Sequence, residues 1–306
     1  REECEAMLAA QKKYGGKVMV CHVLRYAPAF TKVAEWLDAG VIGKLVCIES
    51  LEQVWYAHQA HSFVRGNWRS GEETSPMIIA KCCHDLDLLQ FYAKSKCQSI
   101  TSVGDLTFFK KENAPEGATA KCMDCPHKDT CPYSAKRIYL DRAREGKTGW
   151  PTTAITHIRP ITPEVVEDCL INGPYGRCAF LCDNDVVDHE QTTMTFENGV
   201  KATLTMTAFT RESGRIMTFH GTMGEIRLNE EEGYVTLRPF GAEPETHRIR
   251  DLMISERAGH GGGDYGLVHM LYDMLTGQAS ERTSLEASIE SHLMGIAAEE
   301  SRLAGG

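Results

Sequence analysis

The chain has 306 residues, of which 42% are hydrophobic and 25% are charged, a composition typical of a folded globular protein. This length is enough for one large core or two medium ones. The formal net charge of −9 leaves no basic excess to neutralise phosphates, so we expect neither nucleic acid nor an anionic membrane surface as a partner. The sequence has no apolar run near the roughly 20 residues that a membrane span needs.

The first predicted elements are a helix, a strand and a second helix. Residues 1–13 are helix formers followed by a Gly15-Gly16 pair, and residues 17–23 form a short apolar run typical of a strand buried on both faces. Pro28 begins the second helix, which is predicted to end at residue 39. This order is a piece of an α/β layer too short to stand alone. Because the chain opens in what is predicted to be mid-helix, we expect it to be cut from a longer protein.

Beyond residue 44 the pattern becomes that of an antiparallel sheet. Strands are predicted over residues 45–54, 99–109, 191–196, 201–207, 215–221, 225–229 and 234–239, several with alternating apolar and polar residues. Helices are predicted over residues 77–93, 133–145, 266–276 and 284–303, and residues 110–132 are predicted to be a loop. We therefore predict an α+β fold, with an open, mainly antiparallel sheet covered by helices on one face.

A usual nicotinamide-binding loop is missing from the sequence. Such a loop places glycines between a strand and a helix, so that backbone N–H groups can approach the pyrophosphate. The chain has no G-x-G-x-x-G, and the Gly-rich stretch 259–264 does not follow a buried strand. Taken alone, the sequence is not expected to bind a dinucleotide in the usual way.

Four segments nevertheless resemble the Gfo/Idh/MocA family of oxidoreductases. Residues 20–30, VCHVLRYAPAF, resemble its last Rossmann strand and the crossover into its second domain. Asn67-Trp68-Arg69 and the later stretch 75–87, SPMIIAKCCHDLD, resemble its W-R and its G-G-x-L-L-D-x-G-x-H-D-x-D motifs. Residues 221–226, GTMGEI, resemble its G-T-x-G-E-I turn, and residues 291–302 resemble its closing helix. The segments occur in the family's order, so the resemblance covers nearly the whole chain.

The resemblance implies a domain division and an activity. Residues 1–28 would be the remnant of an N-terminal Rossmann domain, and residues 29–306 a domain for substrate binding and oligomerisation. The full-length protein would be a cytoplasmic NAD- or NADP-dependent dehydrogenase that oxidises a sugar, a sugar derivative or a polyol by hydride transfer. Most of the cofactor site would lie in the missing domain, so this fragment would be inactive. Homodimers or homotetramers are expected.

The resemblance also points to a catalytic pair. Hydride transfer from a sugar carbon needs a base for the hydroxyl proton and a positive group beside the developing alkoxide. His84 is the predicted proton relay, because a pKa near 6.5 suits both directions at neutral pH. The family places an Asp four residues earlier, where this chain has Ala80, and Lys81 is the predicted cationic substitute. Alternatively, His84 is a structural histidine bonded to Asp87 or to a carbonyl, and Lys81 is a surface residue.

Further contacts are predicted around this pair. Trp68 and Arg69 match family residues that lie against the cofactor, with a cation–π surface pair as the alternative. The predicted substrate-binding residues share loop positions or the matched motifs: Arg25, Tyr26, His61, Arg65, Asp87 and His260. Structural or solvated roles remain the alternative for each of them.

A cysteine cluster lies outside the family's common core. Most of the 12 cysteines lie in apolar stretches, which suits reduced thiols in a cytosolic protein. Cys122, Cys125 and Cys131, however, form a C-x2-C-x5-C pattern that could fill three corners of a tetrahedral site. We predict a structural zinc completed by Cys178, with Cys169, Cys182 and His127 as other candidates for the fourth ligand. Iron–sulfur loops share part of this pattern, and free thiols are the remaining alternative.

Two rival functions remain open. Some relatives use tightly held NAD for transient oxidation during glycoside cleavage, so the same scaffold would serve an NAD-dependent glycosidase. Alternatively, the chain is a non-enzymatic, metal-stapled binding module that kept the fold without an Asp at position 80.

Overall fold

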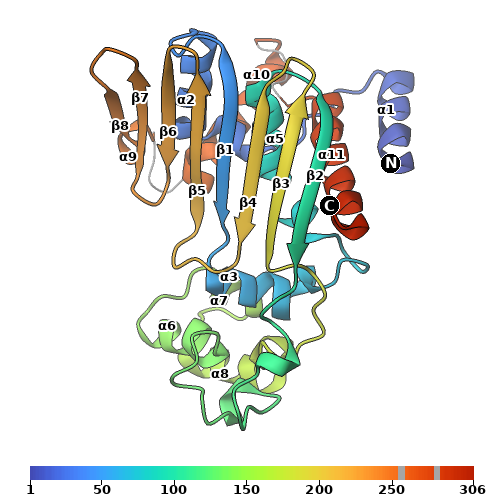
Figure 1. Cartoon of the computed structure of the whole chain (residues 1–306). Coiled ribbons are helices and arrows are strands. Elements are labelled where there is room, and N and C mark those ends of the chain that lie inside the picture. The colour runs from blue at the N-terminus through green and yellow to red at the C-terminus, as the bar shows by residue number, and fades with distance from the viewer. Residues whose placement is uncertain (254–258, 279–282) are drawn as a thin grey trace.

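The computed structural model describes residues 1–253, 259–278 and 283–306, and its centre is one eight-stranded sheet (Figure 1). The strand order is β2-β3-β4-β1-β5-β6-β7-β8. The strands are β1 (Leu45–Gln53), β2 (Cys97–Asp105), β3 (His189–Phe196), β4 (Lys201–Thr207), β5 (Gly214–Gly221), β6 (Gly224–Asn229), β7 (Tyr234–Pro239) and β8 (Glu245–Arg248). Only the β1–β4 pair is parallel, so the predicted α+β class is confirmed and the sheet is mixed.

Alternating burial along the strands separates a helix-covered face from an open one. In β3 the side chains of Glu190, Thr192, Met194 and Phe196 are buried, and those between them are exposed or half-buried. β5 follows the same rule, with Met217 and Phe219 pointing toward the core. Successive strand side chains point to opposite faces, so this period of two produces one covered face.

Helices cover that one face. They are α1 (Glu2–Tyr14), α2 (Pro28–Asp38), α4 (Met77–Ala80), α5 (Cys83–Ala93), α9 (Ile249–Leu252), α10 (Gly263–Thr276) and α11 (Leu285–Ala304), with the 3-10 turns η1 (Val23–Tyr26) and η8 (His260–Gly262). The main core joins α2, α4, α5 and α11 to the sheet through residues such as Phe30, Leu88 and Phe219. None of the helices in the described part of the chain is long and apolar enough to cross a membrane.

A separate group of short helices, which we call the end layer, lies at one end of the sheet (Figure 1). It comprises residues 55–70 and 106–188, with α3 (Tyr56–His58), η2 (Gln59–Arg65), η3 (Asn67–Arg69), η4 (Lys111–Asn113), η5 (Cys122–Asp124), η6 (Lys136–Asp141), α6 (Arg142–Arg144), α7 (Thr152–Ile155), α8 (Pro163–Asn172) and η7 (Pro174–Gly176). Its own small core includes Tyr139, Val166 and Leu170. The Thr162 hydroxyl caps α8 by accepting from the Val165 N–H at 3.4 Å.

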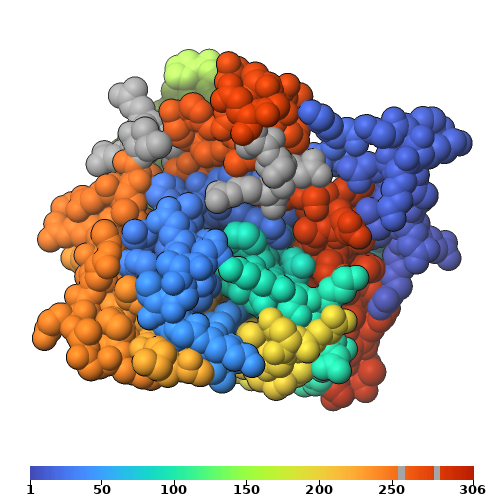
Figure 2. Space-filling view, turned by 90° about the horizontal axis from the view of Figure 1, so that it is seen from above, coloured from blue at the N-terminus to red at the C-terminus, as the bar shows by residue number. Residues whose placement is uncertain are grey.

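The opposite end of the sheet is closed by short turns. The β3–β4 turn packs on the C-terminal end of α5, where the Asn198 amide donates to the Ala93 carbonyl at 2.8 Å (Figure 2, yellow beside teal). At the edge of the molecule α1 lies beside α11, and Arg1 pairs with Glu300 at 2.7 Å (Figures 1 and 2).

The structure corrects several predicted elements. Residues 17–23 do not form a strand, because the described residues place no strand beside them, and only Met19 makes a single bridge, to Ser284. The predicted helix 77–93 is divided into α4 and α5 at Lys81 and Cys82. The predicted helix 133–145 contains the π-helical segment η6, and β8 and α8 were not predicted.

Candidate functional site

The described residues of the candidate site meet where η1, α5 and the end layer approach one another. Asp87, in α5, accepts two hydrogen bonds from Arg25 in η1, from Nε to Oδ2 at 2.7 Å and from Nη2 to Oδ1 at 2.6 Å. Both side chains are buried, so the bidentate pair compensates two charges that could not be desolvated singly. His22 completes this corner, with its Nε2 3.5 Å from Asp87 Oδ1.

His84 lies beside His22 at the start of α5, with the two ring centroids 6.4 Å apart and the planes nearly perpendicular. Burial, and after it the Arg215 guanidinium, lowers the pKa of His84 to about 4. Burial also lowers the pKa of His22, although Asp87 opposes that effect. The expectation of a pKa near 6.5 for His84 is therefore wrong: the imidazole is neutral at pH 7 and can accept a proton. Its Nδ1 is buried and has no hydrogen-bond partner among the described residues.

Lys81 lies at the break between α4 and α5 and pairs with a buried carboxylate. Its Nζ is 2.6 Å from Oε1 of Glu52 in β1, whose other oxygen is 2.9 Å from Nη2 of Arg215 in β5. Arg215 also donates to both oxygens of Asp85, at 2.8 and 3.1 Å. Burial raises the pKa of Glu52 to about 7, while Arg215 and Lys81 act in the opposite direction. Lys81 is therefore held by the sheet and is not a freely solvated surface residue.

Two histidines of the end layer continue the site. Burial lowers the pKa of His58 to about 3, and the charge of Lys81 acts in the same direction on His58 and on His84. Burial and the neighbouring Arg65 lower the pKa of His61 to about 4. We call His22, His84, Lys81, His58 and His61 the imidazole row: the rings of His22 and His84 are neighbours, those of His58 and His61 both contact Trp150, and the Lys81 charge lowers the pKa of both His84 and His58.

The far end of the imidazole row is held by aromatic contacts. His61 Nδ1 shares a hydrogen bond with the Tyr139 hydroxyl at 2.8 Å, and its ring stacks on Tyr175 with the centroids 5.0 Å apart. Trp150 contacts both His58 and His61 edge to face. His61 is neutral and packed against aromatic rings, of which Trp150 is partly exposed to solvent. Such surroundings suit a ligand with apolar and hydroxyl groups better than an anion.

The other predicted substrate residues have structural partners. The Tyr26 hydroxyl lies 2.9 Å from Thr283 Oγ1 and is buried. Arg65 is 1% exposed and donates to the carbonyls of Arg177 and Tyr133, both at 2.7 Å, so its guanidinium points into the end layer. His260, on the exposed turn η8, pairs with Asp264 at 2.7 Å. Arg65 lies in the same segment as His61 and lowers its pKa, whereas among the described residues no contact joins His260 to the imidazole row.

The predicted cofactor residues lie on η3, at the edge of the end layer. Trp68 is 46% exposed, and Arg69 Nε donates to Asp183 at 3.0 Å. The described residues include no strand–glycine loop–helix unit of the kind that holds a pyrophosphate.

Sequence reasoning missed three members of the site. His22 had been noted only as part of a matched segment, while Glu52 and Arg215 lie on strands whose pattern indicated nothing beyond a sheet. One signal could have identified Glu52 and Arg215. The alternation along their strands puts each at a buried position, and a buried charged residue needs a partner.

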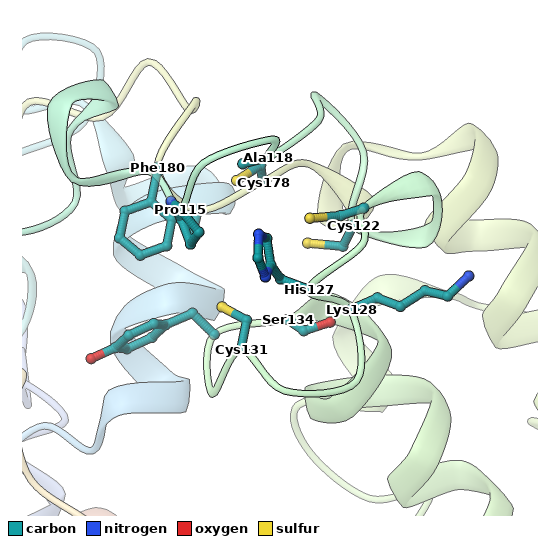
Figure 3. Close-up of a pocket in the computed structure, with 12 residues that line it drawn as sticks. Pro115, Ala118, Cys122, His127, Lys128, Cys131, Ser134, Cys178 and Phe180 are labelled. Carbon is teal, nitrogen blue, oxygen red and sulfur yellow. The ribbon is translucent and has the colours of Figure 1, made fainter.

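The predicted zinc ligands line one small cavity in the end layer (Figure 3). These are Cys122, Cys125, Cys131 and Cys178, with His127 beside them. In the described residues no group of three or more His, Cys, Asp or Glu side chains is already arranged to hold a metal ion.

Comparison with known proteins indicates the fold. No protein-family model matches the chain. YteT of Bacillus subtilis (strain 168), named as a candidate oxidoreductase, is 24% identical over 293 residues, which are 89% of this chain and 63% of that protein. The chain thus spans less than two thirds of the length of this relative.

Two solved structures of oxidoreductases resemble this chain along its whole length. An oxidoreductase from Agrobacterium radiobacter, in complex with NAD+, L-tartaric acid and magnesium, matches with a TM-score of 0.63 at 13% identity, covering 100% of this chain and 68% of that one. Levoglucosan dehydrogenase, in complex with NADH and levoglucosan, matches with a TM-score of 0.64 at 15% identity, covering 100% and 69%. These neighbours are Gfo/Idh/MocA-type oxidoreductases, so the predicted resemblance is confirmed at the level of the fold.

Proposed function

We propose that this chain is the substrate-binding part of an NAD(P)-dependent oxidoreductase that oxidises a sugar, a sugar derivative or a polyol. The observation that carries the proposal is the imidazole row, in which neutral His84 lies at the start of α5 and Lys81, three residues earlier, has its ammonium held by Glu52. A fold alone does not establish an activity, so the proposal depends on this arrangement of a base and a cation. The oxidoreductase fold of the neighbours supports it.

In this proposal His84 takes the proton of the substrate hydroxyl. The lowered pKa leaves the ring unprotonated at pH 7, so it is ready to accept. Lys81, fixed by Glu52 at 2.6 Å, stabilises the negative charge that develops on the same oxygen. The nicotinamide, when bound, supplies the acceptor for the hydride.

Lys81 also accounts for the altered motif. Where relatives are expected to have an Asp four residues before the histidine, this chain has Ala80, so the carboxylate partner of the site must come from elsewhere. Glu52 of β1 supplies one, through Lys81 and not through the histidine itself. The proton from His84 is then released to solvent or to His22, whose ring is in contact with it.

The remaining contacts with substrate and cofactor are assigned from where the side chains lie in the end layer. His58 and His61 at the far end of the row are placed to bind further hydroxyl groups of the substrate. Trp68 and Arg69 are proposed to contact a dinucleotide held mainly by a domain outside these 306 residues, with residues 1–28 as the end of that domain.

Oxidation of a substrate panel tests the function. The full-length protein is incubated with NAD+ or NADP+ and a set of aldoses, sugar acids, anhydrosugars and inositols, and NAD(P)H formation is followed by absorbance. The account predicts stoichiometric reduced cofactor with at least one member. Glycoside cleavage without net cofactor reduction would assign the glycosidase activity instead, and sugar binding without turnover would assign a binding module.

A second proposal concerns assembly. One face of the sheet is free of helices in the described chain, and we propose that it pairs two copies into a homodimer, or into a tetramer by a further contact. Light scattering should give at least twice the 34.0 kDa chain mass. A monomer at high concentration would contradict it.

A further inference from the structure

Four cysteines from three segments of the end layer line a single cavity, of about 20 Å³ (Figure 3). Cys122, Cys125 and Cys178 are each less than a tenth exposed, and Cys131 is half-buried. All of them are free thiols. Four thiols around one space are more than packing needs, because a small apolar residue would fill each position as well.

The backbone around these thiols is fixed by local contacts. A bridge joins Lys121 to Arg177, and the Cys178 N–H donates to the Ala120 carbonyl at 2.9 Å, so residues 122 and 178 begin side by side. The 3-10 turn η5 brings Cys125 back toward Cys122, with the Cys125 N–H 3.3 Å from the Cys122 carbonyl. This close return is the geometry that a C-x2-C pair needs for two sulfurs to face one ion.

Arg65 adds a buried positive charge beside the cavity. Its Nη2 lies 3.6 Å from Cys122 Sγ, while its other hydrogen bonds go to neutral backbone carbonyls. A fully buried guanidinium requires a compensating negative charge. Four thiolates around one divalent ion carry a net charge of minus two, which Arg65 partly neutralises.

We propose that the end layer is stapled by one Zn²⁺ ion coordinated by Cys122, Cys125, Cys131 and Cys178. Of the other candidates, Cys169 and Cys182 do not line the cavity. His127 also lines it, with its Nε2 bonded to the Glu116 carbonyl at 2.7 Å, but four cysteine sulfurs already complete a tetrahedral set. The cavity has room for about one water-sized occupant, which suits a single ion and not an iron–sulfur cluster.

Binding would draw the sulfurs together. The thiols face the cavity but are not yet in coordinating positions, and Zn–S bonds are about 2.3 Å long. Coordination would also fix Arg65, and with it η2, the segment that carries His61.

Metal analysis of the purified full-length protein tests the site, and this proposal does not depend on the proposed activity. Protein expressed with added zinc should contain about one equivalent of zinc and no acid-labile sulfide. Cys125→Ser should lower zinc to a small fraction of an equivalent. Cys169→Ser, an end-layer thiol outside the cavity, is the matched control and should retain it.

Cobalt exchange identifies the ligands even where a variant does not fold. Wild-type protein loaded with Co²⁺ should show the d–d bands of a tetrahedral site and an intense thiolate-to-cobalt charge-transfer band. Folded wild-type protein with less than a tenth of an equivalent of any metal would overturn the proposal, as would iron with sulfide. Equal loss of zinc from Cys125→Ser and Cys169→Ser would overturn the ligand set.

Discussion

Burial is the main cause of the shifted pKa values of the ionisable side chains at the site. The same burial that lowers the pKa of His84, His58 and His61 raises that of Glu52. Desolvation disfavours whichever form is charged, so the three histidines are neutral at pH 7, and Glu52 forms its ion pairs with Lys81 and Arg215 against a raised pKa.

His84→Ala tests the proposed base directly. In the full-length enzyme, turnover with the substrate found in the panel should fall by about 10²–10⁴-fold. The change in KM should be smaller, because the lost group takes the proton in the transition state and does not hold the substrate. His157→Gln, an exposed end-layer histidine, is the control and should leave turnover unchanged. A decrease of less than threefold for His84→Ala would rule out its assignment as the base.

Because the pKa of His61 is lowered in the folded protein, we predict that the free energy of unfolding depends on pH. The pKa of His61 is 6.5 as an ordinary histidine and about 4 in the folded protein, so unfolding takes up a proton between these values. The free energy of unfolding should therefore decrease as pH falls from about 6.5 to about 4, by up to roughly 1.4 kcal/mol per pH unit from this residue. Glu52 and Glu190, with pKa values raised by burial, act in the opposite direction, so only a comparison of variants isolates the term.

Urea unfolding at several pH values makes that comparison. His61→Gln should be less stable than wild type at pH 7, and the gap should narrow as pH falls toward 4. His157→Gln should follow the wild-type curve in parallel. A constant gap between wild type and His61→Gln would show that His61 is not held neutral by the fold.

Among the secondary-structure elements, the strands were predicted best. The ranges 201–207 and 234–239 match β4 and β7, because alternation is a local signal that needs no knowledge of the rest of the chain. β8 was missed because Glu245–Arg248 is mostly exposed and contains no apolar residue. The break between α4 and α5 was missed because Lys81 pairs with Glu52, a contact that no local pattern encodes.

A substitution at Gly221 tests whether β5 and the turn after α2 must lie as close together as they do. A Cβ at this position would lie 2.1 Å from the Ile42 carbonyl oxygen, so the backbone would have to shift. Gly221→Ala should lower the free energy of unfolding by about 1–3 kcal/mol. Gly149→Ala, where a Cβ meets nothing within 4 Å, should change it by less than about 0.5 kcal/mol. Equal stability of the two variants in urea unfolding would contradict this packing.

At the scale of the whole molecule, the site exists because the end layer closes over one end of the sheet. His22, His58, Lys81 and His84 come from segments that are distant in sequence, and only the tertiary fold makes them neighbours. The motif resemblance could identify His84, Asp87, Trp68 and Arg69, whereas the contacts of Glu52 and Arg215 with Lys81 and Asp85 could not be predicted, because they join segments that are distant in sequence. The cysteine pattern predicted the set that lines the cavity, but spacing alone could not choose Cys178 over Cys182.

The central claim is that these residues form the substrate half of a nicotinamide-dependent enzyme, and calorimetric titration with NAD+ and NADP+ tests it most directly. The 306-residue chain is compared with a chain extended upstream through the proposed dinucleotide-binding domain. The account predicts that the extended chain binds one of the two cofactors and that the 306-residue chain binds neither. Absence of binding by both chains would contradict the claim, and equally tight binding by the shorter chain would contradict the placement of the cofactor site outside it.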